Sequence, residues 1–210
     1  MKVLNLFAGL GGNRQLWEGV EVTAVEMDVR VAEVYAQRFP DDTLIVGDAH
    51  QYLLDNHQDF DFVWSSPPCQ SHSRMQKATR HDVTKYPSMM LYQEIIFLQH
   101  FFDGDWVVEN VIPYYKPLIP ATSVGRHLFW SNFTIRAHDI PAPSGFIDLP
   151  SSTGVKILKD WLGIQYEGNI YLGGNHCPQQ ALRNCCHPLL GKQILDCARQ
   201  PKPQLTMFEG

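Results

Sequence analysis

A cysteine and a glutamate, each close to the end of an apolar run, are the residues of this chain best suited to covalent chemistry. Cys69 follows the run DFDFVW and the stretch SSPP, and Glu109 lies near the end of the run DWVVENV. Both runs predict buried strands. In a parallel sheet both side chains would lie at the carboxyl edge, where α/β proteins bind ligands. A thiolate beside a carboxylate can add to an electrophilic ring while the carboxyl group stabilises a ring nitrogen that gains electron density.

Taken alone, one cysteine is more often an inert core residue, so its assignment depends on its neighbours. The two prolines before Cys69 fix the direction in which the loop leaves the sheet. Arg126 and His127 stand at the entry of the run HLFWS, and either could supply the positive charge that favours a thiolate. These residues predict an enzyme with Cys69 as nucleophile and Glu109 as the group that contacts the ring nitrogen.

A glycine-rich turn near the start of the chain predicts a nucleotide-type pocket. The apolar run KVLNLF is followed by AGLGGN and then by RQLWEG, which predicts a helix whose apolar face includes Leu16, Trp17 and Val20. Glycines let a ligand approach the backbone, and a helix N-terminus offers free N–H groups. The spacing is not GxGxxG. The next predicted strand, EVTAVEMD, ends in Glu26 and Asp28, at the position where a carboxylate holds a ribose diol, although a solvated strand end is the alternative.

Strands and helices alternate through the first half of the chain. Apolar spacing predicts a helix over residues 29–39, a strand and helix over 43–53, and a helix over 89–102. Asp48 could accept from an exocyclic amine or cap the second of these helices. Further on, we expect a strand over 125–136, a helix in VKILKDWLG, and a helical segment over 179–199 broken by Pro188. This pattern predicts an α/β fold with a doubly wound, mostly parallel sheet and helices on both faces.

Composition narrows the classes of function. The chain has 210 residues, a formal net charge of −5 and five cysteines with no CxxC pair, so we expect reduced thiols and no metal site. It shows no signal peptide and no membrane-length apolar run, so we expect a soluble, cytoplasmic protein. The net charge argues mildly against nonspecific polyanion binding, but a local basic cleft is compatible with it. The polar loop over residues 71–88 is rich in basic side chains that suit a phosphate backbone, and it is a candidate lid.

Six motifs, met in order along the chain, resemble those of the cytosine-C5 DNA methyltransferases. They are NLFAGLGG, VEMD, GDAHQYL, SSPPCQSHS, VVENV and RNCCHPLLGK, which are similar to the family's first, second, third, fourth, sixth and tenth motifs. The resemblance implies a Rossmann-like, S-adenosylmethionine-dependent methyltransferase fold. It further implies transfer of a methyl group to C5 of a flipped-out cytosine in double-stranded DNA, with S-adenosylhomocysteine as the product and no metal.

The resemblance also implies a set of site residues. In the family mechanism Cys69 would add to cytosine C6 while Glu109 stabilises N3, with Arg126 or His127 orienting the base or the thiol. Glu26 would hold the ribose hydroxyls, Met27 would pack on the adenine and Asp48 would bind its amine. The full cofactor set is Phe7, Gly9, Gly11, Gly12, Glu26, Met27, Asp48, Pro68 and Asn184. The expected DNA contacts are Gln70, Ser73, Arg74, Lys77, Arg80 and Lys85.

Four departures from the family pattern stand out. The eighth motif usually carries two arginines, but here it offers Arg126 with His127 beside it, and Ser71-His72-Ser73 replaces the usual Gly-Phe-Ser. Arg183 and His187 stand where glycine and proline are common. The target-recognition region is short.

We therefore expect a catalytic and cofactor-binding domain over 1–136 plus 179–199, a reduced recognition lobe over 137–178 and a tail over 200–210. A partner subunit or a second copy could complete recognition, as in a small phage or restriction-modification enzyme.

Three other readings remain open. A tRNA cytosine-C5 methyltransferase would use the same chemistry, but the Cys-Phe-Thr signature of that branch is not found after the glutamate motif. A non-catalytic DNA-binding or regulatory subunit would be expected to lose the catalytic pair, whereas Cys69 and Glu109 are both present. Transfer of a modified group from an altered sulfonium cofactor is the third, because the sequence around Asn184 departs from type.

Overall fold

The protein is built on one seven-stranded sheet whose strands run in the order β3-β2-β1-β4-β5-β7-β6. The computed structural model describes residues 1–73, 86–150, 152–172 and 176–201. Its strands are β1 (Lys2–Leu6), β2 (Glu21–Glu26), β3 (Thr43–Val46), β4 (Phe62–Ser65), β5 (Asp105–Val111), β6 (Thr122–Val124) and β7 (His127–Ser131). Its α-helices are α1 (Val29–Arg38), α2 (Ala49–Asn56), α3 (Met90–Phe101), α4 (Gly154–Leu162), α5 (Gln180–Arg183) and α6 (Pro188–Ala198), with short 3-10 turns η1 (Asn13–Leu16) and η2 (His57–Asp59).

The order of the strands places a ligand site beside β1. Strands β1 to β5 pair in parallel, while β7 is antiparallel to both β5 and β6. The chain winds outward from β1 in one direction to β2 and β3, and in the other to β4 and β5. At such a switch point the loops at the strand carboxyl ends part, and α/β folds bind ligands there. The predicted α/β class with a doubly wound, mostly parallel sheet is confirmed.

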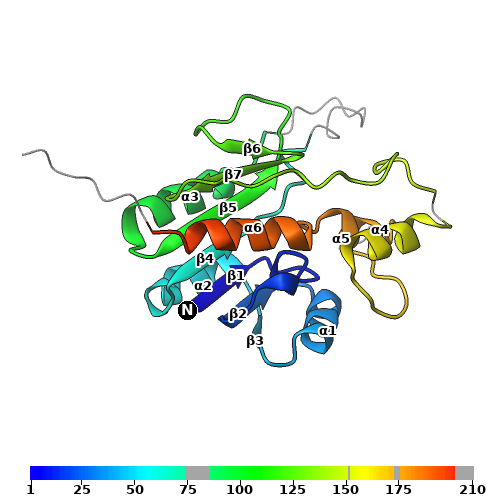
Figure 1. Ribbon diagram of the computed structural model, residues 1–210, viewed down its shortest axis with the longest axis horizontal. Coiled ribbons are helices and arrows are strands. Elements are labelled where there is room, and N and C mark those ends of the chain that lie inside the picture. Colours follow the sequence, from blue (N-terminus) through cyan, green and yellow to red (C-terminus); the bar gives the residue numbers. More distant parts are fainter. Residues whose placement is uncertain (74–85, 151, 173–175, 202–210) are drawn as a thin grey trace, which may run out of the picture.

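Helices cover both faces of the sheet because the strand side chains alternate between two apolar cores. Leu4 and Leu6 of β1 face the core that contains the buried residues of α2 and α3. Val3 faces the other core, to which α6 contributes Leu190 and Ile194. Figure 1 shows α6 lying across the sheet, with α1 beside it near the β2 and β3 edge.

One predicted helix is wrong. The segment after the glycine turn forms only the 3-10 turn η1, and Trp17 is already extended with φ −82° and ψ 124°. The chain must reach β2 at Glu21 within a few residues, and Gly19 turns it back with φ +65°. The face that this helix would have covered is instead covered by α6. Trp17 is buried there and its indole N–H donates to the carbonyl of Gly191 at 3.1 Å.

The other predicted elements hold, with changed ends. Helices α1, α3 and α4 match the segments in which helices were expected, while β7 covers only His127–Ser131 of the strand expected over 125–136. Pro188 does not break a continuous helix but begins α6, because proline fits the first helical turn. The break lies before it, between α5 and α6.

The segment after β7 packs against the turn after β1 and against α1. Leu158 and Leu162 of α4 share a core with Leu10 and with Val31 of α1. In Figure 1, α4 and α5 lie together at one end of the molecule, on the side of α1. Within the described residues, no helix has the length and apolar character needed to cross a membrane.

Candidate active site

Two adjoining cavities lie at the carboxyl ends of β1 and β4. The larger, about 240 Å³, is lined by the turn after β1, the tip of β2 and the link between α5 and α6. The smaller, about 70 Å³, contains Cys69, Glu109 and His127. Ser66, Pro68 and Asn184 line both cavities. The structure therefore brings the predicted nucleophile and the predicted carboxylate together, next to a second and larger space.

Most of the predicted cofactor residues line the larger cavity. These are Phe7, Gly9, Gly12, Glu26, Met27, Pro68 and Asn184. Gly11 is not among the lining residues. A Cβ there would lie 2.3 Å from the ring of Phe39, so this glycine serves packing against α1. Asp48 is not in the lining either, although Gly47 and Ala49 on both sides of it are. Its Oδ1 accepts from the backbone N–H groups of His50 and Gln51, at 2.9 and 3.1 Å, and so caps α2.

The loop after β1 is held in an unusual conformation that opens the larger cavity. Phe7 has φ +54°, a left-handed conformation that costs a non-glycine residue about 1–2 kcal/mol. Gly9 donates its N–H to Glu26 Oε2 at 2.9 Å, and Asp28 N–H donates to Oε1 of the same carboxylate at 2.8 Å. At Gly12 a Cβ would lie 2.5 Å from the carbonyl oxygen of Cys186, so only glycine lets these two walls approach so closely.

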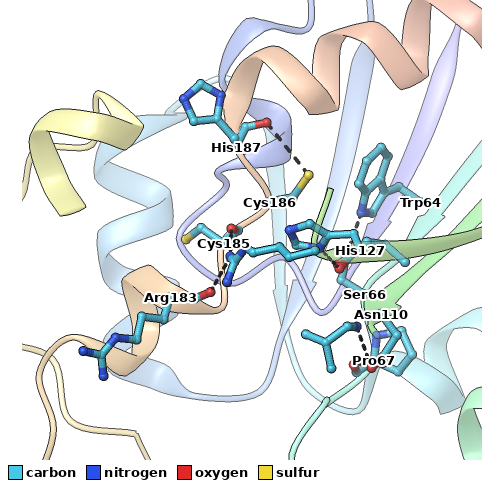
Figure 2. A network of polar contacts seen from close by, with 12 residues as sticks. Trp64, Ser66, Pro67, Asn110, His127, Arg183, Cys185, Cys186 and His187 are labelled. Atoms are coloured by element: carbon cyan, nitrogen blue, oxygen red, sulfur yellow. Dashed lines mark hydrogen bonds and ion pairs between the residues drawn. The ribbon is translucent and has the colours of Figure 1, made fainter. Parts of the chain in front are cut away.

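The loop that carries Cys69 is fixed by backbone hydrogen bonds. The Cys69 carbonyl accepts from the N–H groups of His72 and Ser73, both at 2.9 Å. On the other side, the Asn110 amide donates to the Pro67 carbonyl at 2.9 Å, as Figure 2 shows. Asn110 follows Glu109 on β5, so the same strand end positions the carboxylate and the loop of the nucleophile.

Glu109 is buried and receives hydrogen bonds from two sides. His127 Nδ1 contacts its Oε1, and the Ser66 hydroxyl also hydrogen-bonds its carboxylate. Ser66 Oγ in turn accepts from the indole N–H of Trp64 at 2.8 Å, so its single proton is directed to Glu109 (Figure 2). Neither the pairing of His127 with Glu109 nor the role of Ser66 was predicted from the sequence. The alternation of residues along the runs VVENV and HLFWS indicated which side chains share a face of each strand. It did not indicate how the two strands pair with each other.

The cavity gives the two reactive groups opposite protonation preferences. Burial raises the pKa of Cys69 to about 11, the negative charge of Glu109 adds to this, and Arg126 opposes it. Burial also acts to raise the pKa of Glu109, but His127, Ser66 and Arg126 outweigh it and the pKa lies below its ordinary value. The cavity therefore holds a thiol and a carboxylate, whereas addition to a ring needs a thiolate and a proton for the ring nitrogen.

Arg126 and His127 have different surroundings, although they are neighbours in the sequence. Arg126 Nη2 donates to the carbonyls of Arg183 and Cys185, at 2.7 and 3.3 Å, and its guanidinium lies 4.3 Å from the centre of the Phe146 ring. Figure 2 shows these carbonyls at the end of α5 and on the link between α5 and α6. Arg126 thus joins β7 to that link and to the segment after β7, while His127 faces Glu109.

His72 is a buried histidine whose role the sequence did not reveal. Its Nδ1 lies 2.6 Å from the hydroxyl of Tyr115, and the Tyr92 hydroxyl donates to that of Tyr115 at 3.2 Å. Burial lowers the pKa of His72, which favours the neutral ring. This side chain ties the end of the Cys69 loop to the loop after β5. The departure Ser71-His72-Ser73 was the available signal, since it placed a polar ring where the family usually has phenylalanine.

The predicted DNA contacts are only partly placed. Gln70 lines the larger cavity, and Ser73 forms an isolated β-bridge with Pro113. Arg74, Lys77, Arg80 and Lys85 lie outside the described residues, and so does most of the candidate lid. In the part of the chain that is described, no cluster of three or more histidine, cysteine, aspartate or glutamate side chains is placed to hold a metal ion.

The fold and the cavity at the switch point define an α/β protein of the methyltransferase type. The model of one family, the C-5 cytosine-specific DNA methylases, matches residues 1–111, which are more than half of the chain. The chain belongs to this family, and the family implies S-adenosylmethionine as methyl donor. The match includes β1 to β5 and the glycine turn, and it therefore includes Cys69 after β4 and Glu109 on β5.

Comparison with other proteins adds the following findings. No curated protein matches the chain. Among solved structures, a DNMT2 mutant from Spodoptera frugiperda is 25% identical, with a TM-score of 0.38, and the match covers 52% of this chain and 35% of that protein. A SAM-dependent methyltransferase from Agrobacterium tumefaciens is 18% identical, with a TM-score of 0.39, and the match covers 55% of this chain and 40% of that protein. The chain thus spans well under two thirds of either protein.

Proposed function

We propose that the protein transfers a methyl group from S-adenosylmethionine to C5 of cytosine in double-stranded DNA, through a covalent bond between Cys69 and C6. The observation that carries this proposal is the shared wall of the two cavities. Cys69 and Glu109 line the smaller cavity, and Ser66, Pro68 and Asn184 separate it from the larger cavity at the glycine turn. A base in one and a sulfonium in the other would meet across this wall.

The larger cavity fits the methyl donor by its shape and its donors. The close approach of Gly12 to Cys186 leaves a backbone-lined floor, and Glu26, at the tip of β2, is the acid placed for a ribose diol. Exposed Met27 lies at the rim, where it would pack on the adenine. Asp48 would reach the adenine amine only through the oxygen that does not cap α2. When bound, S-adenosylmethionine supplies an electrophilic methyl group.

The residues of the smaller cavity account for activation of the base. Cytosine C5 is a poor nucleophile until a thiolate adds to C6, which moves electron density onto C5 and N3. Cys69 forms this bond, and Glu109 stabilises N3 as it gains density. Once C5 has taken the methyl group from the sulfonium, whose S–CH3 bond breaks, loss of the C5 proton and expulsion of Cys69 restore the aromatic ring. The cytosine must leave the DNA stack to reach a buried thiol, at a cost of a few kcal/mol.

Target recognition is proposed to involve residues 137–178 as a reduced lobe on the catalytic domain formed by 1–136 and 179–199. The described part of this lobe packs on the cofactor side through Leu158, Leu162 and Phe146, so a short target site or a partner subunit would complete recognition. Duplex DNA is preferred over tRNA as acceptor because the family is one of DNA methylases and the Cys-Phe-Thr signature is absent after VVENV.

The test is methyl transfer from radiolabelled S-adenosylmethionine to duplex DNA and, in parallel, to tRNA, with the modified nucleoside identified by mass. We expect 5-methylcytosine in DNA. Cys69→Ser should abolish turnover while calorimetry still shows binding of S-adenosylhomocysteine, and Cys197→Ser, at the far end of α6, should leave both unchanged. Turnover by Cys69→Ser would rule out the covalent mechanism. An altered sulfonium identified by mass in the purified protein would instead indicate transfer of a modified group.

A further inference from the structure

The contact between His127 and Glu109 is specific to the way β5 and β7 pair. In the antiparallel register Glu109 lies opposite Phe129, and Val111 lies opposite His127. Glu109 and His127 are therefore diagonal neighbours on one face of the sheet. Both side chains are buried, with exposed fractions of 7% and 6%, and Nδ1 contacts Oε1 directly. This geometry fixes a histidine on the carboxylate that is proposed to meet the base.

Among the groups around this pair, His127 is the one suited to transferring a proton. Among the described side chains, Ser66 and His127 hydrogen-bond Glu109, and the imidazole is the one of these two groups that serves proteins as an acid or a base. The other titratable or charged groups that face Glu109 are Cys69 after β4, Arg126 in the turn before β7 and Cys186 before α6. Arg126 directs one nitrogen to two backbone carbonyls and, as a guanidinium, does not release its proton.

We infer that His127 holds the proton that Glu109 delivers to N3 of the substrate cytosine, so that the pair acts as one acid. This inference rests on the proposed function. As the Cys69 sulfur bonds to C6, the C5–C6 π pair shifts to C4–C5 and the C4–N3 π pair moves onto N3. Nδ1 of the protonated His127 gives its proton to the Glu109 carboxylate, Glu109 passes the proton on to N3, and the thiol proton leaves to water. When the ring is restored, the proton returns by the same path.

The same transfer eases formation of the thiolate. The negative charge of Glu109 is one cause of the raised pKa of Cys69, so that charge is absent from beside the sulfur while Glu109 carries the proton, before the proton passes to N3. An arginine in place of His127 could orient Glu109 but could not supply this proton. His127 is thus a positioning residue that acts through Glu109, and its effect should appear in the pH dependence of adduct formation.

The first arm of the test needs no substrate. Nitrogen-15 NMR of histidine-labelled protein would follow the His127 ring, identified by the signal that His127→Gln removes. We expect Nδ1 to be protonated in the wild type to a higher pH than in Glu109→Gln, because the carboxylate holds the imidazolium. A His127 titration that is the same in both proteins would overturn the inference.

The second arm measures the rate of adduct formation on DNA that contains 5-fluorocytosine, from pH 6 to 9. The wild type should give a bell, with a rising limb from Cys69 and a falling limb from the His127–Glu109 pair. His127→Gln and His127→Arg should lose the falling limb within this range and react on the order of 10²-fold more slowly at pH 7. Equal binding of S-adenosylhomocysteine and equal thermal unfolding would show that both variants are folded.

The two failures are distinguishable. If both variants keep the wild-type falling limb, the pair is not the acid and the inference is wrong, while the proposed function stands. If the wild type forms no adduct with any acceptor, the proposed function fails, and the NMR arm still decides whether His127 and Glu109 share a proton.

Discussion

Cys69 is held as a thiol, because burial and the charge of Glu109 both raise its pKa. A thiol in this state resists alkylation and oxidation, since the thiolate is the reactive form. Under the proposed mechanism, the thiol would lose its proton only when a proton on Glu109 has removed that charge. This arrangement would spare the thiol between turnovers.

This leads to a prediction about alkylation. Glu109→Gln removes the neighbouring negative charge, so the pKa of Cys69 should fall and iodoacetamide should label it faster between pH 7 and 9. Each unit by which the pKa falls raises the thiolate fraction about tenfold. Peptide mass spectrometry would measure the rate, with Glu26→Gln as the control carboxylate of the larger cavity and Cys69→Ser as the blank. Slower or unchanged labelling in Glu109→Gln would contradict the electrostatic account.

At the level of residues the sequence predicted which side chains gather, but not how they pair. Cys69 and Glu109 could be placed at one sheet edge because both follow apolar runs. The partners of Arg126 and His127 could not, since they depend on the register of β5 against β7 and on the carbonyls before α6. Asp48 was left open between two roles, and the structure shows that one of its oxygens caps α2.

Among the elements, the junction between η1 and α6 replaces the expected helix after the glycine turn. A Cβ on Gly191 of α6 would lie 2.3 Å from the carbonyl oxygen of Asn13, so the two segments touch through their backbones. Arg14 of η1 is also paired to Asp42 by two hydrogen bonds, of 2.9 and 2.8 Å. This junction fixes the floor of the larger cavity, because Asn13 lines it.

We predict that Gly191→Ala lowers the free energy of unfolding by about 1–3 kcal/mol, because the added methyl group forces α6 away from η1. Urea denaturation would measure this change. Lys192→Ala, the next residue on α6, removes only an exposed pair with Asp196 and should cost no more than about 0.5 kcal/mol. Equal stability of the two variants would show that the close contact at Gly191 is easily relieved.

The periodic elements were predictable, and the failure after the glycine turn has a specific cause. Apolar spacing is a local signal, and it was sufficient for α1, α3 and α4. The run RQLWEG has the same local signal. However, Trp17 packs on Trp64 and donates a hydrogen bond to the carbonyl of Gly191, which lies near the other end of the chain. A contact between such distant residues leaves no trace in local periodicity.

In the molecule as a whole, the segment after β7 is attached to α1 and to the wall of the larger cavity. Arg30 of α1 donates to the Tyr171 carbonyl, and Leu172 lines the larger cavity. Phe146 lies under the guanidinium of Arg126, and its carbonyl accepts from Nε of Arg183, which lines the smaller cavity. The sequence showed a region of loose pattern but not this attachment, because its contacts with Leu10 and Val31 are long-range.

We predict that S-adenosylhomocysteine slows amide hydrogen exchange in two places at once, the turn over residues 7–12 and the segment around Ile170 to Leu172. A ligand that binds the folded state protects the residues that line its cavity, and those packed on them, from exchange. Mass spectrometry of exchanged peptides would show this, with α3, on the other face of the sheet, as the internal control. Protection confined to residues 7–31 would contradict a cofactor contact by this segment.

The central claim is that Cys69 forms a bond to C6 of a cytosine, and the most direct test is to trap that bond. Duplex DNA with 5-fluorocytosine in many sequence contexts would be incubated with the protein and S-adenosylmethionine, because fluorine at C5 blocks the final elimination. The account predicts an adduct that survives denaturation, maps to Cys69 and is absent from Cys69→Ser. If no adduct forms with DNA or with tRNA, although S-adenosylmethionine is bound, the proposed covalent mechanism is wrong.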